Sequence, residues 1–426
     1  MKRGWIRSAG LALSLMIAGE TSAMSVQWDW VASVEHRETQ ASVFFPQESV
    51  GDEQSIHALL DVELRDGNWV GSFAVKGDDL YNSDQQVDPE SQWLVRELFW
   101  QGPIADSDWE LTLGKVRLGW GVGYGYRPLD IITPYPRHPV GIQVEEGAGV
   151  ASVSMFDQAG EWTMLYADTA WVSQDRSELA EDQRGSGLRR YWLSGDHEWQ
   201  GIAYYDDVRH GLMGAGWVTV LDEAWALHVS SVYQRRYEGF ELPASPQAPV
   251  QLVTHRDGWQ ALLGFTWASA AGQQVVLEYW YDNRSWHHAQ WQTALHQAEQ
   301  LQRALVSMQQ ARNGLRSSYG RAFQAENLVR HNVMLHWTMD PAVWQQGALT
   351  RNIGWLADLT PTVDVLFAPE DQGVIATQWL AYPVYDSGEA TLDLELAARF
   401  MTGDRQSVFQ NLPDKRMIFL NLKGRF

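Results

Sequence analysis

The sequence predicts an all-β protein, namely an antiparallel transmembrane β-barrel of about 16 to 18 strands. Three observations support this fold class: a C-terminal strand that alternates to its last residue, many further alternating segments, and the lack of a long apolar run. A membrane admits only helices and closed barrels, because backbone polar groups in its core need partners within the protein. After the N-terminus, no segment has the roughly 18 consecutive apolar residues of a helical span. Strands are therefore the remaining way to cross a membrane.

The N-terminus has the layout of a cleavable signal peptide. Lys2, Arg3 and Arg7 precede an apolar run at 9–19, and small residues follow at 21–23. A run this short is typical of export rather than of a membrane anchor. We therefore expect residues 1–23 to be removed and residues 24–426 to form a single barrel.

Eighteen segments show the period of two expected for strands. In 55–65, for example, Ile56, Leu60 and Leu64 oppose Asp61 and Glu63. The other clear segments are 26–35, 259–267, 275–282, 392–400 and 415–426. The less regular ones are 69–79, 91–101, 108–117, 147–157, 161–170, 187–196, 199–206, 211–221, 224–236, 329–339, 355–367 and 372–382. The alternation is weakest at 91–101 and 355–367, so sixteen strands is an alternative to eighteen.

The links between these segments alternate in length. The long ones are 37–53, 118–146, 171–186, 237–258, 283–328 and 403–413, and most of the others are short turns. Because bacterial barrels of this kind have short periplasmic turns and long extracellular loops, both termini are expected in the periplasm.

One long link carries a helical pattern. Apolar residues recur at three- and four-residue steps over 287–312, which predicts one helix of roughly 35–40 Å, with Gly314 as its stop. Such a helical insert in an extracellular loop could cover the mouth of the barrel, fill its lumen, pack on a partner or rest on the barrel's own loops.

The last twelve residues separate into two faces. Ile418, Leu420, Leu422 and Phe426 share one face, and polar residues dominate the other. This segment resembles the closing strand of bacterial outer-membrane β-barrels, whose last residue is typically Phe. The resemblance implies an outer-membrane location in contact with lipid. It also implies that Leu420, Leu422 and Phe426 form the signal read by the barrel-assembly machinery.

A second segment, residues 111–134, carries a further resemblance. Gly114-Lys115, Trp120-Gly121, Pro128, Asp130 and Pro134 are spaced as in porin-like and alginate-export-type outer-membrane barrels. This resemblance covers about two dozen residues and implies the class of protein more than a substrate.

The same region suggests a pore constriction within the long loop 118–146. Glycines at 119, 121, 123 and 125 let the backbone fold tightly, and several prolines then stiffen it. If this loop enters the lumen, opposed charges could filter solutes there. The candidates are Arg117, Arg127 and Arg137 facing Asp130, Glu145 and Glu146. In the alternative interpretation, these residues pin the loop to the wall by ion pairs.

The inward parity of the clear strands carries acids. They are Asp29, Asp61, Glu63, Glu278, Asp393 and Glu395, and they predict a negative lumen that favours cations or neutral polar solutes. Ion pairs with Arg65, Arg399 and Lys423 are the alternative. The whole chain has a formal charge of −21, which does not favour nucleic acid as a partner.

These observations favour a porin-like channel for the passage or export of hydrophilic solutes, either small molecules or polysaccharide. A plugged barrel that serves as a scaffold or surface receptor is the alternative. No Gly-x-Ser-x-Gly motif indicates an enzyme, although a barrel lipase with a Ser–His pair on its outer wall stays open. A soluble β-sandwich would require the C-terminal pattern to be a coincidence. The sequence predicts no cofactor and no metal site.

Overall fold

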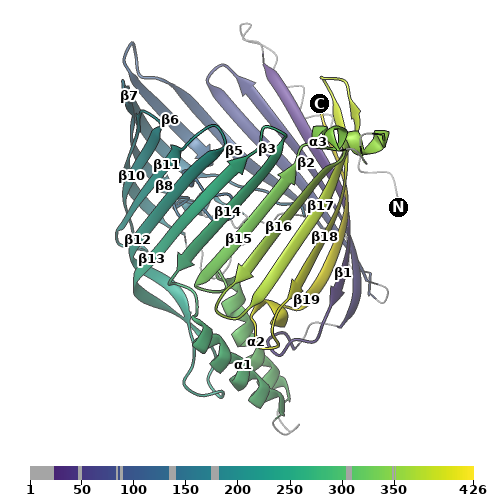
Figure 1. Ribbon diagram of the computed structural model, residues 1–426. Helices are drawn as coiled ribbons and strands as arrows, with labels where there is room; N and C mark the ends of the chain where they lie inside the picture. The colour runs from purple at the N-terminus through teal and green to yellow at the C-terminus, as the bar shows by residue number, and fades with distance from the viewer. Residues whose placement is uncertain are drawn as a thin grey trace, which may run out of the picture.

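The computed structural model is a closed antiparallel β-barrel (Figure 1). It describes residues 24–46, 50–82, 85–86, 90–133, 141–173, 182–303, 309–347, 350 and 352–426. The predicted signal peptide, residues 1–23, and the predicted pore residue Arg137 lie outside the described residues.

Nineteen strands are found within the described part of the chain, and eighteen of them form the wall. The exception is β4, which has two residues and pairs with the tip of β3. The strands are β1 (Ser25–Thr39), β2 (Gly51–Asp66), β3 (Trp69–Asn82), β4 (Gln85–Gln86), β5 (Glu90–Pro103), β6 (Trp109–Val116), β7 (Ala148–Asp157), β8 (Gly160–Asp168), β9 (Arg184–Ser194), β10 (His197–Asp206), β11 (Leu212–Val220), β12 (Trp225–Glu241), β13 (Gln251–Ala268), β14 (Gln273–Asp282), β15 (His331–Met339), β16 (Thr360–Ala368), β17 (Gly373–Asp386), β18 (Thr391–Thr402) and β19 (Asp414–Arg425). The larger predicted strand number is confirmed, and the two weakest segments are the strands β5 and β16.

The barrel closes where β1 pairs with β19. Their register runs from Asp29 opposite Arg425 to Thr39 opposite Asp414. The terminal residue takes part, since Phe426 and Trp28 exchange two backbone hydrogen bonds and stack their rings with 4.6 Å between centroids. The pairing of β1 with β19 therefore leaves no open sheet edge at the closure. A strand that crosses a membrane needs this, because its backbone polar groups find no water there.

The two faces of the wall differ as the alternation predicts. On β19, Leu420 is 48% exposed on the outer face, whereas Phe419 and Asn421 are buried on the inner face. Leu277 on β14 and Leu394 on β18 are likewise exposed on the outer face. The exposed apolar side chains of these strands therefore point away from the lumen. On this outer face they would contact lipid instead of water.

The two ends of the barrel are unlike. The start of β1, the C-terminus and most of the short turns lie at one end, and the longest loops lie at the other (Figure 1). This agrees with the predicted alternation of link lengths, except that the link at 340–359 on the terminal end is long and holds α3 (Ala342–Gln346) and η4 (Gly354–Asp358). The remaining short helices are η1 (Thr169–Trp171), η3 (Arg321–Gln324) and η5 (Phe409–Asn411).

The predicted helical insert is two helices rather than one. They are α1 (His288–Arg303) and α2 (Gln309–Gly320), and residues 304–308 between them are not described. The prediction that helix ends at Gly314 was wrong, because α2 continues six residues further to Gly320. A glycine inside a helix costs only about 1 kcal/mol, which tertiary packing readily offsets. Among the described helices, none has the length and apolarity needed to cross a membrane.

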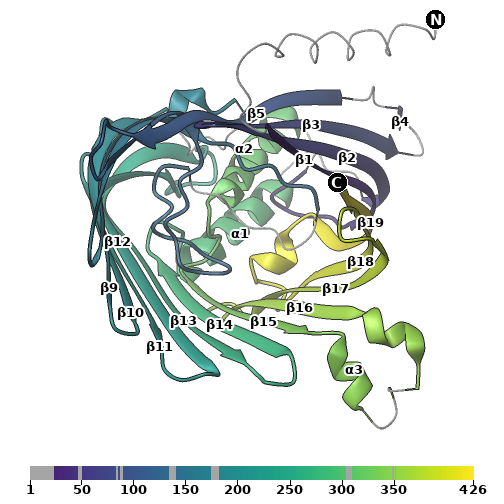
Figure 2. The same cartoon turned by 90° about the horizontal axis from the view of Figure 1, so that it is seen from above.

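The two helices rest on the barrel's own loops. Trp291 of α1 packs against Phe44, Trp286 and Phe323, and its Nε1 donates to the Leu328 carbonyl at 2.7 Å. Arg316 of α2 donates to the Val43 carbonyl at 3.0 Å. Seen along the barrel from the end that carries the termini, α1 and α2 fall within its outline (Figure 2). They therefore form a cap at the far end.

Candidate functional site

The described parts of the loop between β6 and β7, residues 117–133 and 141–147, run inside the barrel (Figure 2), and we call them the loop 117–147. Leu129 is fully buried against the inner wall. The wall makes room for it with two glycines on β11, since a Cβ at Gly214 or Gly216 would lie 2.6 or 2.9 Å from the Leu129 side chain. Further along, Val144 packs against Ala74 and Leu94 on the other side of the lumen. The loop therefore contacts the wall at separated places.

Glu278 on β14 anchors this loop. Its two carboxylate oxygens accept hydrogen bonds from the backbone N–H groups of Tyr124 and Gly125 at 2.6 and 2.8 Å. His228 Nε2 lies 2.8 Å from the same carboxylate. Glu278 was predicted as a lumen acid, but its side chain is buried. Its carboxylate binds the backbone of the loop and does not face a solute in the lumen.

Asp130 holds the turn that begins the loop. Its Oδ1 accepts from the backbone N–H groups of Trp120 and Gly121 at 2.7 and 2.6 Å, which lie ten and nine residues earlier in the chain. Arg127 is 3.8 Å away, at the long limit of an ion pair. Burial raises the pKa of Asp130, while the Gly121 amide and Arg127 act to lower it. Asp130 therefore shapes the loop, and Arg127 is left half-exposed in the lumen.

Arg117 and Glu145 lie where the loop meets the wall. Arg117 pairs with Glu97 of β5 at 2.8 Å and reaches Glu145 at 3.5 Å. Arg96 of β5 donates to the Glu145 carbonyl at 3.2 Å and pairs with the predicted lumen acid Asp61. This network fastens both ends of the loop to β5 by charge-assisted hydrogen bonds.

Glu146 does not point into the lumen. It forms a buried ion pair with Lys115 and accepts from the Ser173 hydroxyl at 2.7 Å. Lys115 pairs in register with Leu98 and Gly149 on the neighbouring strands. Because Leu98 is exposed on the outer face, Lys115 belongs to the outward-facing set of its strand. Glu146 therefore joins the loop to the wall and to the segment after η1.

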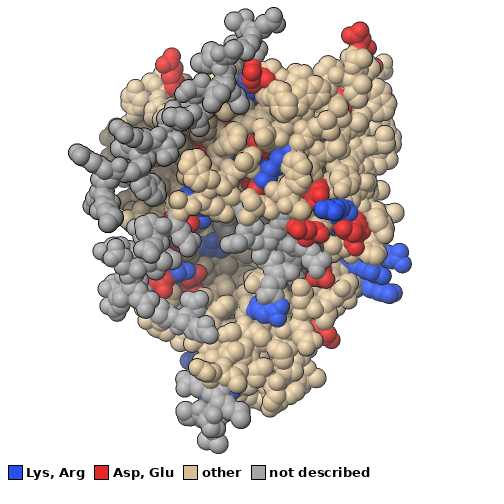
Figure 3. Space-filling view, turned by 180° about the vertical axis from the view of Figure 1, so that it is seen from behind, with Lys and Arg blue, Asp and Glu red and all other residues tan. Residues whose placement is uncertain are grey.

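The other predicted lumen acids lie along one stretch of wall, β18–β19–β1–β2, and most carry a partner. Asp29 pairs with Arg425 at 2.8 Å, and Glu63 pairs with Arg65 at 2.6 Å. Glu395 accepts from Lys423 at 2.8 Å and from Asn421 at 2.6 Å. Asp393 stands opposite Lys423 in the β18–β19 register. From behind, Figure 3 shows both signs of charge next to one another around a hollow, within a wide area free of charge.

Two sets of residues were missed by the sequence reasoning. The first is the inward Arg189, which lies over the Trp120 ring at 5.5 Å and pairs with Glu161 at 3.5 Å. Arg399, which the sequence offered as an ion-pair partner of the lumen acids, stands opposite Thr377 on β17. Arg399 Nε has no hydrogen-bond partner among the described residues. Arg189 lies in the less regular segment 187–196, so the sequence pattern did not indicate that it faces the lumen.

The second missed set is Ser55, His57 and Asp78. Ser55 Oγ lies 2.9 Å from His57 Nε2, and Asp78 Oδ1 lies 2.6 Å from His57 Nδ1. These are the contacts of a nucleophile, a base and an orienting acid. However, Glu35 lies 3.4 Å from the same Nε2, so the hydroxyl shares this nitrogen with a carboxylate. The cluster also lies on the inner wall, not on the outer wall where a lipase would meet lipid.

Comparison with known proteins identifies the fold. No family model matches the chain, and no curated protein matches it. Several solved structures, however, match the fold of the chain. OccAB1 of Acinetobacter baumannii superposes with a TM-score of 0.53 at 8% identity, covering 95% of this chain and 96% of that one. OccK8 (OprE) of Pseudomonas aeruginosa gives 0.51 at 10%, covering 94% and 98%. OccK2 (OpdF) of the same organism, solved in complex with glucuronate, gives 0.51 at 10%, covering 95% and 97%. The chain therefore has the 18-stranded barrel fold of these porin structures.

Proposed function

We propose that the chain is an integral outer-membrane channel for small hydrophilic solutes. The observation that carries the proposal is the division of the lumen. The loop 117–147 is anchored through Leu129 and Glu278, and the ion-paired wall β18–β19–β1–β2 is lined by partly exposed charges. A barrel of 16–18 strands has room for an aqueous path unless something fills it. The path runs between the loop, which narrows it, and the charged wall.

The solute class follows from the lining. The paired acids weaken the negative field that their number alone would give, and Arg127 stands half-exposed beside the loop at 3.8 Å from Asp130, the long limit of an ion pair. Two of the similar structures were solved with small carboxylic acids, vanillate for OpdK and glucuronate for OccK2. We therefore propose small polar solutes, monocarboxylates included, in place of the cation preference expected from the acids.

The test is single-channel conductance of the refolded chain in a planar bilayer, beside a variant in which residues 288–320 are replaced by a short Gly-Ser linker. Steady current in the parent supports the channel, and the reversal potential in a salt gradient reports its charge preference. Retained heat-modifiable migration shows that the variant is folded. Silence in both folded proteins would contradict the channel.

The plugged barrel is the second candidate, and the cap formed by α1 and α2 favours it. Fully buried residues such as Tyr319 and Ala294 fix these helices over the far end of the barrel. Silence in the parent with current in the linker variant would identify the cap as a plug and support a scaffold or receptor.

Alginate-type export is a finer version of the channel, suggested by residues 111–134 alone. In these residues Trp120, Gly121 and Asp130 form the loop's first turn, which any barrel with an inward loop could use. Block of the current by uronate oligomers, but not by neutral oligosaccharides of equal length, would support it.

A further inference from the structure

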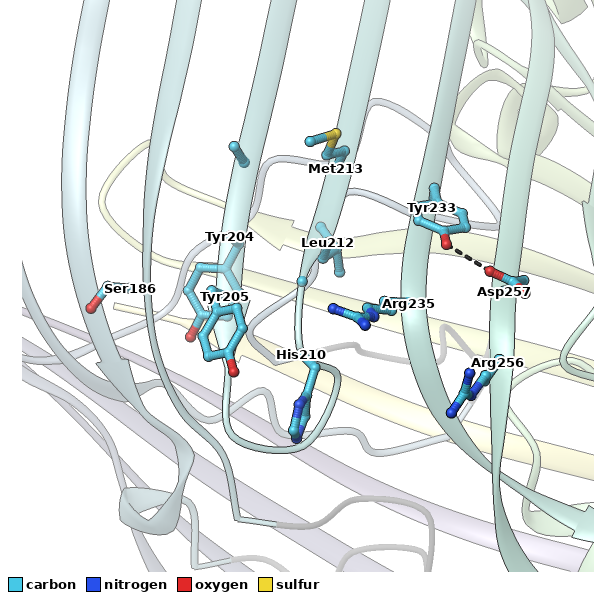
Figure 4. A pocket seen from close by; sticks show the side chains of 12 residues that line it. Ser186, Tyr204, Tyr205, His210, Leu212, Met213, Tyr233, Arg235, Arg256 and Asp257 are labelled. Carbon is cyan, nitrogen blue, oxygen red and sulfur yellow. Dashed lines mark hydrogen bonds between the residues drawn. The ribbon is translucent and has the colours of Figure 1, made fainter.

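A groove of about 540 Å³ opens on the outer face of the barrel between β9 and β13 (Figure 4). We call it the outer groove. Its apolar part comes from Met213, which is 68% exposed and stands opposite Ala203 on the outward parity. Tyr205 and Tyr233 share this parity and flank it. The groove is therefore separate from the lumen and from the loop 117–147.

Positive charge gathers at one end of the outer groove. Arg235, Arg256 and His210 line it, and the Arg236 guanidinium lies 3.4 Å from His210 Nε2. Both Arg235 and Arg256 are exposed, and neither has an ion pair among the residues that the structure describes. Asp257 is the acid of the lining, and it accepts a hydrogen bond from the Tyr233 hydroxyl at 2.7 Å. Nearby Asp206 forms an ion pair with Arg209 at 2.7 Å. The cluster thus keeps an excess of positive charge.

The outer groove lies at the level where a membrane meets water. It is at the end of β10–β13 that carries the long loops, since His210 belongs to the link between β10 and β11 on that side. Outward aromatic side chains gather there: Tyr205 and Trp259 are 58% and 49% exposed. Tyr and Trp concentrate at membrane interfaces, where one end of the ring is apolar and the other is wet. A lipid beside Met213 would therefore bring its headgroup to the arginines.

We propose that the outer groove binds the phosphorylated headgroup of a glycolipid in the leaflet on the side of α1 and α2. Arg235 and Arg256 supply guanidinium forks that match phosphate geometry. Tyr233 and Tyr205 supply rings and hydroxyls for the sugar, and Met213 contacts the acyl chain. Basic pockets at the interface commonly hold lipid headgroups. The proposal rests on the membrane placement of the barrel but not on its conducting solutes.

The experiment measures equilibrium binding of fluorescent bisphosphorylated lipid A to the refolded chain in detergent micelles. Binding can therefore be detected even if the barrel conducts no current. The variant is Arg235→Gln/Arg256→Gln. The control is Arg405→Gln/Arg416→Gln, which removes the same charge from exposed residues elsewhere on that end. We expect affinity to fall at least about tenfold in the groove variant, because two charge-assisted contacts are lost. In the control we expect a change under about twofold.

Two further arms identify the ligand. Dephosphorylated lipid A should bind the parent at least about tenfold more weakly, and millimolar inorganic phosphate should compete poorly, because it lacks the sugar and acyl contacts. Heat-modifiable migration confirms that each variant is folded. Equal losses in the groove variant and the control, equal binding of the dephosphorylated lipid, or full competition by inorganic phosphate would each overturn the assignment.

Discussion

The two sides of the inner wall are built differently. Along β7, β8 and β10–β12 the inward side chains are apolar and buried, among them Val150, Leu165, Ile202 and Val232. Along β18, β19, β1 and β2 the inward side chains are charged, paired and partly exposed, as in Asp29–Arg425 and Glu395–Lys423. We call these the packed side and the ion-paired side. An inner wall can be apolar only where something covers it, and here the loop 117–147 does so.

The difference separates two tasks of the lumen. On the packed side, burial fixes the position of the loop, because each apolar side chain removed from water stabilises that position. On the ion-paired side, half-exposed pairs stabilise little, and their net worth is about 0–1 kcal/mol. Changes on the packed side should therefore alter stability and pore size, whereas changes on the ion-paired side should alter charge preference.

The largest effect is expected from Leu129→Ala on the packed side. Leu129 is fully buried against β11, so its truncation should lower the free energy of unfolding by about 2–5 kcal/mol. The freed loop should also raise the single-channel conductance. Thermal unfolding in detergent and bilayer recording check both effects. The exposed turn residue offers a control, Leu221→Ala, and an equal effect there would contradict the packed side as described.

A change on the lipid side of the wall comes next. Leu277 of β14 is 45% exposed on the outer face, so Leu277→Arg should cost about 2–4 kcal/mol if it lies near the middle of the bilayer. Gln274→Arg on the inward parity of the same strand is the matched control. Folding into lipid vesicles during a urea titration measures the two. If both variants fold as well as the parent, the assignment of inner and outer faces fails.

The comparison also explains what the sequence could predict. Segments 26–35, 55–65, 392–400 and 415–426 alternate cleanly because their inner faces, on β1, β2, β18 and β19, meet water and charges. Segments 147–157, 161–170, 199–206 and 211–221 alternate poorly because a loop covers their inner faces on β7, β8, β10 and β11. Segments 259–267 and 275–282 alternate clearly although Leu262, Trp280 and Glu278 on their inner faces also contact the loop. A blurred period of two therefore accompanies the covered wall where its inward side chains are small or apolar.

The site was less predictable than the fold. Parity alone assigned Glu278 to an open lumen, but its carboxylate binds two backbone amides of a loop about 150 positions earlier in the chain. Asp130 and Glu146 carry charge in a Gly-rich loop, as a filter would, yet their partners are Trp120, Gly121 and Lys115. Local pattern does not tell which partner a carboxylate meets across the barrel.

A smaller effect is expected on the ion-paired side from Lys423→Gln. The change removes the partner of Glu395, leaves Asn421 as its neutral donor, and adds net negative charge to the path. Stability should change by under about 1 kcal/mol, because Lys423 is 43% exposed. The reversal potential in a salt gradient should move toward cations. Lys415→Gln, at the rim beside Glu38, is the control, and an equal shift there would mean that position along the path is irrelevant.

The smallest effect concerns pH and the turn at Asp130. Burial raises the pKa of this carboxyl in the folded loop, so its ionisation is disfavoured relative to the unfolded chain. A group of this kind lowers stability as pH rises from its unfolded pKa to its folded one, and its contribution is constant above that range. Asp130→Asn keeps an oxygen that can accept from Trp120 and Gly121 but cannot ionise. The variant should match the parent in acid and exceed it in stability near neutral pH, as measured by midpoints of thermal unfolding across that range. If the unfolding midpoint of the parent instead rises above that of the variant as pH rises, the two amide hydrogen bonds, rather than burial, set the ionisation of Asp130. The same bonds would then set the shape of the loop.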